Sequence, residues 1–304
     1  MPAHRPSRRL IRLASSWLGL VLATVAMPLT GAAPSAEAAT SMPRFDHIYV
    51  IVMENHEFGS IVGNAQAPYI NFLIRHYGLA TNYTAVGHPS EPNYLALWAG
   101  STFGVHDDGI HNIAARNLAD QMAAGGKTWH VYAQDLPRTC STVSSAYGRV
   151  DLLGAPGWYA RKHEPAISFT NIARSSLRCS KITRLSTFSP IAANFELIVP
   201  NMANDMHDGS IAQGDAFLRA FVPRITGRTS FANSLLVITW DEGSSSLGGG
   251  GRVATLVISP REKGRFISAI PHNHYSLLRT IQDSWRLGCL NNTCSANDLR
   301  EFFR

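Results

Sequence analysis

Acidic, amide and imidazole side chains follow three separate apolar runs in the sequence. Glu54 and Asn55 follow the run at 47–53, and Asp241 and Glu242 follow the run at 234–240. A third run, at 195–201, precedes four such residues: Asn204, Asp205, His207 and Asp208. Each group alone is typical of a turn, since Asp, Asn and Gly often end strands. Three groups together favour a site for a divalent cation that handles phosphate, because such ions prefer hard oxygen ligands with one or two imidazoles.

The elements that would position these groups are buried strands alternating with helices. Continuous β-branched and apolar runs predict strands that are covered on both faces, at 47–53, 128–134, 195–201, 234–240 and 253–259. Periodic apolar segments between them predict helices at 67–78, 91–100, 214–227 and 273–288. This alternation predicts a three-layer α/β/α sandwich with a mostly parallel central sheet. In such sheets ligands bind beyond the carboxyl ends of the strands, where the polar groups are expected.

Ser90 is the candidate nucleophile. It stands with Pro92 immediately before an apolar helical segment, in "HPSEPNY". Serine followed by Glu-Pro is also an ordinary helix start. A helix N-terminus, however, presents free N–H groups that stabilise phosphate. A serine hydroxyl placed there beside a cation has the requirements of an alkoxide nucleophile.

Five motifs, taken in order along 45–288, resemble the bacterial phosphoesterase family of secreted acid phosphatases and phospholipases C, within the alkaline phosphatase superfamily. They are "MEN", "PSEPNY", "NDMHDG", "TWDEG" and "NHYSLLRTI". The length of the chain and the form of the last motif are similar to those of the smaller acid phosphatases and phosphoinositide phosphatases of this family. The resemblance implies a metal-dependent phosphomonoesterase with a phosphoserine intermediate. A phospholipase C or phosphodiesterase acting on lipid head groups is the alternative, and a non-enzymatic secreted binding module is the third reading.

The same resemblance implies roles for individual residues. Ser90 would be phosphorylated during turnover, and the metal ligands would be Glu54, Asn55, Asp241, Glu242 and the Ser90 oxygen. His207, paired with Asp208, would protonate the leaving group. Asn112 and His106 would contact phosphate. His274 matches a histidine of the family that precedes the last helix. His111 and Asp205 are further candidates. Glu242 stands where many sites of the superfamily have Asp or His, so the ion remains open among Ca, Mg, Mn and Zn.

The first 38 residues predict an export signal. A basic segment with Arg5, Arg8, Arg9 and Arg12 precedes an apolar run at 17–29, and "AEA" at 36–38 suits a signal peptidase. "SRRLIR" resembles a twin-arginine signal, so export by either the Sec or the twin-arginine route is expected, to the periplasm, the cell envelope or the medium. An uncleaved anchor is the alternative. Without 1–38 the chain has 23 basic and 20 acidic residues, which argues against a nucleic-acid partner.

The remaining residues, 39–304, predict one domain. Its expected partner is a small-molecule or lipid phosphate ester, and no stable membrane insertion is expected. The sequence gives no indication of the oligomeric state. Four cysteines in an exported chain favour disulfides. Three connectivities are open, and Cys140–Cys179 with Cys289–Cys294 closes the shortest loops. A zinc site is disfavoured because no CxxC pair is present. The segment 135–190 predicts an irregular insertion over the sheet edge, with His163 in a solvated loop.

Overall fold

The run at 47–53 forms the central strand of the sheet. β1 (His47–Met53) lies between β8 (Phe195–Val199) and β9 (Ser234–Trp240), and it is parallel to both. Every residue of β1 after His47 is buried, as a strand covered by helices on both faces requires. The computed structural model describes residues 41–147 and 158–304, so the predicted signal at 1–38 lies outside the described residues.

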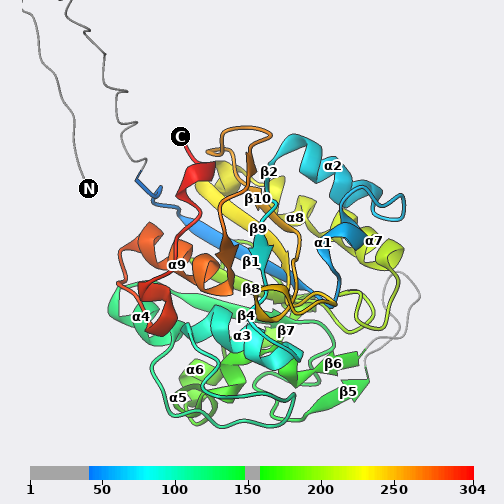
Figure 1. The fold of residues 1–304 in the computed structure, drawn as a ribbon. Coiled ribbons are helices and arrows are strands. Elements are labelled where there is room, and N and C mark those ends of the chain that lie inside the picture. The colour runs from blue at the N-terminus through cyan, green and yellow to red at the C-terminus, as the bar shows by residue number, and fades with distance from the viewer. Residues whose placement is uncertain (1–40, 148–157) are drawn as a thin grey trace, which may run out of the picture. The chain divides into compact units, whose positions relative to one another are not determined.

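Eight of the described strands form one large sheet in the order β11-β2-β10-β9-β1-β8-β4-β7 (Figure 1). Its other members are β2 (Gly78–Ala80), β4 (Trp129–Ala133), β7 (Ile182–Arg184), β10 (Thr255–Ile258) and β11 (Ile267–Ser268). β10 is antiparallel to its neighbours β9 and β2, whereas the other pairs in this sheet are parallel. The mostly parallel sheet is therefore confirmed. The apolar run at 253–259 does not reveal the reversed direction, because a strand buried on both faces looks the same either way.

Helices cover both faces of this sheet and complete the predicted three layers. They are α1 (Phe58–Ile61), α2 (Pro68–His76), α3 (Ser90–Ala99), α4 (Leu118–Ala124), α7 (Ile211–Phe221), α8 (Pro223–Thr226) and α9 (His274–Trp285). α3 packs against α9, and α2 packs against α7. Figure 1 shows α3, α4 and α9 on one side of the sheet and α2, α7 and α8 on the other. No helix in the described ranges is long and apolar enough to cross a membrane.

The segment predicted as an insertion contains short elements and one edge strand. β5 (Ser145–Tyr147) pairs with β6 (Trp158–Ala160), and residues 148–157 between them lie outside the described residues. The 3-10 helices η1 (Arg161–His163) and η2 (Pro165–Ser168), followed by α5 (Thr170–Ala173) and α6 (Ser176–Cys179), lead into β7 at the sheet edge. A small separate sheet pairs β3 (Tyr83–Thr84) with β12 (His272–Asn273).

Two disulfides tie down the insertion and the C-terminal region. Cys140 is bonded to Cys179, and Cys289 is bonded to Cys294. This is the connectivity that closes the shortest loops. The first bond joins α6 to the loop that follows β4, so it fixes the insertion to the sheet.

Candidate active site

The register of the central strands brings two carboxylates together. Met53 lies opposite Trp240, so Glu54 and Asp241 are the next residues beyond the carboxyl ends of β1 and β9. Backbone hydrogen bonds continue past the strands, from the Asp241 amide to the Met53 carbonyl at 2.9 Å. The Asn55 amide then donates to Asp241 Oδ1 at 3.0 Å. The sheet thus fixes the backbone of both acids, and both side chains are buried.

Asp205 comes to the same place from the loop after β8. The Glu54 amide donates to the Asp205 carbonyl at 2.8 Å, which joins this loop to the end of β1. The Asp205 carboxylate accepts from the His207 amide at 2.8 Å, as in an Asx turn. Its side chain is buried. The prediction that three strand ends deliver acids to one edge is therefore confirmed.

Ser90 is the first residue of α3 and points at this acidic group. Its hydroxyl lies 3.2 Å from Glu54 Oε2 and 3.4 Å from Glu242 Oε1, and the residue is buried. Asn93 holds the approach to the helix, because its Oδ1 accepts from the Val86 amide at 2.9 Å and its Nδ2 donates to the Gly87 carbonyl at 2.8 Å. The hydroxyl is thus rigidly placed at the N-terminal end of a ten-residue helix, where anions are favoured.

His163 belongs to this site, and its prediction as a solvated loop residue is wrong. It is buried in η1, with Nε2 3.2 Å from Glu54 Oε2 and Nδ1 3.4 Å from Asp205 Oδ2. The ring of Tyr94 stacks on it at 5.3 Å, and the Tyr94 hydroxyl donates to the other oxygen of Glu54. Glu164 caps η2 by accepting from the Ala166 and Ile167 amides, which turns the chain inward here.

These side chains fit a divalent cation. One ligand atom from each of Glu54, His163 and Asp205 lies within 4.8 Å of the others. His163 Nε2, Asp205 Oδ2 and Asp241 Oδ2 are buried without a hydrogen-bond partner among the described residues, and His163 approaches Glu54 without hydrogen-bond geometry. Buried polar atoms are normally satisfied, so unpaired oxygens and an imidazole that face one another fit a bound cation, which would satisfy them together.

The electrostatics lead to the same conclusion. Burial, followed by the charges of Asp241 and Asp205, holds the pKa of Glu54 well above its ordinary range. Burial likewise raises the pKa of Asp205 and of Asp241. Burial lowers the pKa of His163 far below its ordinary value, so its imidazole is neutral and available as a ligand. Three carboxylates resist ionising together unless a cation compensates them.

Glu242 lies on the other side of Ser90 and is paired with His88. The His88 ring nitrogen Nδ1 contacts a Glu242 oxygen, and Nε2 lies 3.0 Å from the Ser245 carbonyl. Burial, together with the charge of Asp241, raises the pKa of Glu242 to about 7. Burial would lower the pKa of His88, but the Ser245 carbonyl and Glu242 outweigh it and raise that pKa. Ser90 therefore has a near-neutral acid–base group within 3.4 Å.

A lysine lies at the rim of the site. Lys162 Nζ is 2.9 Å from Asp108 Oδ2 and 3.4 Å from His207 Nε2, and His207 Nδ1 is 2.7 Å from Asp208 Oδ1. Burial would lower the pKa of Lys162, but Asp108, Glu54 and Asp241 outweigh it, so the ammonium stays charged. Asp108 also accepts from the Glu91 amide at 3.0 Å, which links this group to the start of α3.

The remaining predicted residues lie outside this buried group or contact it differently. The Asn55 side chain is exposed, and its contact with Asp241 is through the backbone amide. His106 and Asn112 are exposed in the loop after α3, while His111 lies 2.9 Å from Asp107 and 3.9 Å from Glu91. This places His111 behind the first turn of α3.

His274 is buried behind Asp241 at the start of α9. Its Nε2 lies 2.5 Å from the Asp241 carbonyl, and its Nδ1 lies 3.1 Å from the Tyr83 hydroxyl. Burial lowers its pKa to about 4. With both ring nitrogens engaged by the protein, His274 is placed to orient the Asp241 backbone.

Sequence reasoning missed four residues that shape the site: Tyr94, His88, Lys162 and His163. Tyr94 had a usable signal, since it stands four residues after Ser90 and therefore on the same face of the helix. His88 also had one, because it directly precedes "PSEP". Lys162 and His163 had none, because they come from the insertion rather than from a strand end or a helix start.

Comparison with known proteins agrees with this architecture. A model of the Phosphoesterase family matches residues 64–288. A protein of Mycobacterium tuberculosis (strain ATCC 25618 / H37Rv) named phosphatidylinositol-3-phosphatase is 35% identical over 288 residues, covering 93% of this chain and 91% of its own length. The phosphate-repressible acid phosphatase of Penicillium chrysogenum is 28% identical over 268 residues, which are 84% of this chain and 63% of that protein. The chain thus spans less than two thirds of the fungal relative.

Solved structures share the fold at low sequence identity. The phosphonate monoester hydrolase of Agrobacterium radiobacter superposes with a TM-score of 0.53 at 13% identity, over 85% of this chain and 77% of that one. A protein of the alkaline phosphatase superfamily from Vibrio parahaemolyticus gives a TM-score of 0.52 at 13% identity, over 86% and 71%. The fold is therefore that of the alkaline phosphatase superfamily. The chain belongs to the Phosphoesterase family and is a phosphoric ester hydrolase.

Proposed function

We propose that this protein is a metal-dependent phosphomonoesterase of the acid phosphatase type, in which Ser90 carries the phosphoryl group during turnover. The observation that supports this most is the position of the Ser90 hydroxyl, 3.2 Å from Glu54 and 3.4 Å from Glu242 at the edge of a buried acidic group. The N-cap of α3 is Pro89, and the Ser90 hydroxyl donates to the two glutamates, so helix capping does not account for its position.

Glu54, Asp205, Asp241 and His163 would hold the cation, with Glu242 and the Ser90 oxygen at its other side. A bound divalent cation would lower the pKa of the serine hydroxyl and offset the negative charge on phosphate. This set keeps the predicted Glu54, Asp241, Glu242 and Ser90, and it adds His163 and Asp205. The exposed side chain of Asn55 has a place only if it turns inward when phosphate binds.

The residues around Ser90 suit the two proton transfers of phosphate ester hydrolysis. Glu242 Oε1, 3.4 Å from the Ser90 hydroxyl, is placed to accept its proton as the oxygen attacks phosphorus. His207 lies at the rim with Nε2 3.4 Å from Lys162 Nζ, so as an imidazolium it would donate its Nε2 proton to the departing alkoxide and would then regain a proton from the Lys162 ammonium. The Lys162 ammonium and the N-terminus of α3 would stabilise charge on the phosphoryl oxygens.

A phosphoinositide monoester is the substrate class that we propose. It is supported by the 35% identical relative, which is named for a phosphatidylinositol 3-phosphate phosphatase activity and aligns over nearly its whole length. Export is also part of the proposal. The basic and apolar segments at the N-terminus and the two disulfides support it. Cell fractionation tests export, with the protein expected in the medium or envelope and a cytosolic location contradicting it.

The activity is tested with purified protein lacking 1–38, on p-nitrophenyl phosphate and bis(p-nitrophenyl) phosphate, with and without a chelator. We expect turnover of the monoester to exceed that of the diester, and we expect chelation to abolish both. Preference for the diester would instead support the phosphodiesterase reading. Full activity after prolonged chelation would contradict the metal requirement, and inactivity on both esters would contradict the proposal. The soluble head group of a phosphatidylinositol 3-phosphate then tests the substrate class.

A further inference from the structure

An arginine cluster lies at the amino ends of the parallel strands, whereas Ser90 lies beyond their carboxyl ends. A hollow of about 540 Å³ is lined by Ser41, Met42, Pro43, Arg44, Arg261, Asp283, Arg286, Arg300 and Arg304. Arg44 precedes β1, and Arg261 follows β10, which runs antiparallel to β9. Both therefore lie at the amino end of β1, and the seven residues of this strand, about 23 Å in length, separate them from the acidic group.

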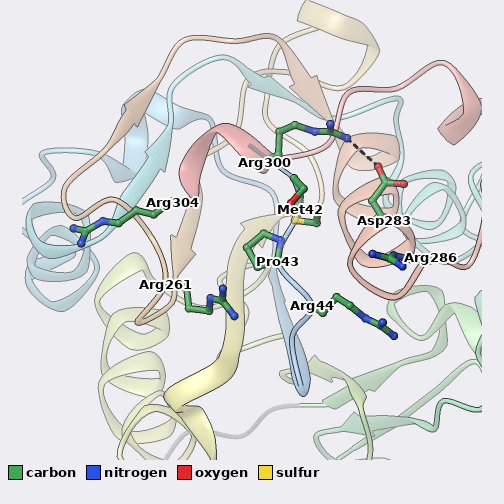
Figure 2. Close-up of a pocket in the computed structure, with 9 residues that line it drawn as sticks. Met42, Pro43, Arg44, Arg261, Asp283, Arg286, Arg300 and Arg304 are labelled. Atoms are coloured by element: carbon green, nitrogen blue, oxygen red, sulfur yellow. Dashed lines mark ion pairs between the residues drawn. The ribbon is translucent and has the colours of Figure 1, made fainter. Parts of the chain in front are cut away.

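The cluster is assembled from four separate chain segments. Figure 2 shows Met42 and Pro43 in the middle, with the arginine side chains projecting around them. Asn233 connects two of these segments, because its Nδ2 donates to the Arg44 carbonyl at 3.2 Å and its Oδ1 accepts from Arg261 Nη1 at 2.9 Å. The backbone positions are therefore set by contacts within the fold.

Most of this positive charge has no acidic partner. Asp283 is the acidic residue of the lining, and it already faces Arg279 at 2.7 Å and Arg300 at 3.5 Å. Arg300 is also paired with Asp298 at 2.7 Å. The other four arginines are exposed and form no ion pair with a described carboxylate: Arg44, Arg261, Arg286 and Arg304. The charge of Glu262 acts on Arg304, so the uncompensated charge at the hollow comes mainly from Arg44, Arg261 and Arg286, and an anion is its natural complement.

We propose that the arginine cluster binds phosphate-bearing anions, as a site separate from the catalytic edge. Guanidinium groups form bidentate hydrogen bonds to phosphate oxygens and are less strongly hydrated than ammonium groups, so arginines in this lining suit phosphate better than lysines would. The buried Met42 and Pro43 give the hollow an apolar floor. A phosphate group attached to a larger molecule, or the phosphate of an anionic lipid head group, supplies the same chemistry.

The test uses a triple variant, Arg44→Gln, Arg286→Gln and Arg304→Gln. The side chains of these three arginines form no ion pair with a described carboxylate and do not contact Asn233. A matched control removes the same charge elsewhere, through Arg75→Gln, Arg174→Gln and Arg219→Gln, which are exposed. Calorimetry with inorganic pyrophosphate on chains that also carry Ser90→Ala reports binding of a free phosphate. Flotation with phosphatidylcholine vesicles, with and without phosphatidylglycerol, reports binding to a lipid head group.

We expect the triple variant to bind the recognised probe about tenfold more weakly than the control, with a smaller dependence on salt. Binding to pyrophosphate alone would identify a soluble ligand, and binding to the phosphatidylglycerol vesicles would identify a lipid head group. Binding of neither probe, or equal binding by the triple variant and the control, would overturn the proposal. Turnover of p-nitrophenyl phosphate by the triple variant with Ser90 intact is expected to stay within about twofold, since this edge is remote from the catalytic one.

Discussion

The two edges of the central sheet carry opposite charge and are built in opposite ways. At the carboxyl edge Glu54, Asp205 and Asp241 are buried, and their carboxylates face one another. At the amino edge the arginines are exposed around an open hollow. Burying like charges destabilises the fold unless something compensates them, whereas exposed charges are solvated. Our proposals therefore assign a tightly held cation to the first edge and an exchangeable anion to the second.

The most severe way to break the carboxyl edge is to remove its nucleophile. Ser90→Ala is expected to lower kcat on a phosphomonoester by about a thousandfold or more, because no other described hydroxyl lies between Glu54 and Glu242. Its melting temperature should change little, since the N-cap of α3 is Pro89 and the hydroxyl bonds to Glu54 and Glu242 instead of the backbone. Ser60→Ala, in α1, is the control and should keep full activity. A Ser90→Ala enzyme that retained a tenth of the activity would contradict the nucleophile assignment.

His163→Gln tests the ligand that the insertion contributes. We expect kcat/KM to fall by about 10- to 100-fold, with part of the loss recovered when the metal concentration is raised. Metal titration of activity measures this, and a purely structural role would not respond to added metal. The control is His76→Gln, because His76 bonds only within α2, to the Phe72 carbonyl at 2.8 Å. An unchanged metal requirement in His163→Gln would remove His163 from the cation site.

Metal removal should destabilise the protein through the acidic edge. A cation at a hundred times its Kd stabilises the folded state by about 2.7 kcal/mol, so chelation should lower the melting temperature by about 5–10 °C. Asp205→Asn removes one of the facing charges, so this variant should lose less on chelation. Calorimetry at one pH, with and without chelator, compares the unmodified protein with Asp205→Asn. Asp46→Asn, which changes an exposed residue, is the control. Equal losses in all three would mean that the cation binds elsewhere.

Glu196 is a buried carboxylate on the same sheet that has no part in the site, so it separates burial from metal binding. Burial raises its pKa to about 8. The folded protein then keeps a proton that the unfolded chain releases near pH 4.5, so this contribution to stability is full below pH 4.5 and is lost as the pH approaches about 8. Between pH 5 and pH 8, Glu196→Gln should reduce the loss of unfolding free energy by about 1–3 kcal/mol. The melting temperature of this variant should therefore fall less over the same pH range. An unchanged pH dependence would contradict the raised pKa.

Much of the acidic edge could be predicted because it follows from repeated local patterns. The runs before Glu54 and Asp241 form β1 and β9 at the predicted residues, and their parallel register places the two acids side by side. The Ser-Glu-Pro signal predicts the start of α3 to within one residue, since Ser90 is its first residue and Pro89, instead of Ser90, is the N-cap. These predictions succeeded because each residue's position depends on the strand or helix that directly adjoins it.

The rest depends on how distant segments pack, which no local pattern encodes. His163 reaches Glu54 and Asp205 only because the insertion folds over the sheet edge and a capped 3-10 turn directs the ring inward. His274 adjoins the predicted helix start, yet its ring faces the Asp241 backbone instead of the open side of the site. The arginine cluster could not be predicted either, because its members come from four separate segments of the chain. The net charge of the whole chain does not show that they lie together.

The central claim, that Ser90 carries the phosphoryl group, is tested most directly by trapping it. The protein is mixed with a phosphomonoester, quenched in acid during turnover, digested and mapped by mass spectrometry. We predict a phosphorylated peptide that contains Ser90, formed in proportion to active enzyme and absent from Ser90→Ala. Phosphate on a histidine such as His207 instead, or steady turnover with no phosphorylated peptide at any time point, would contradict the account.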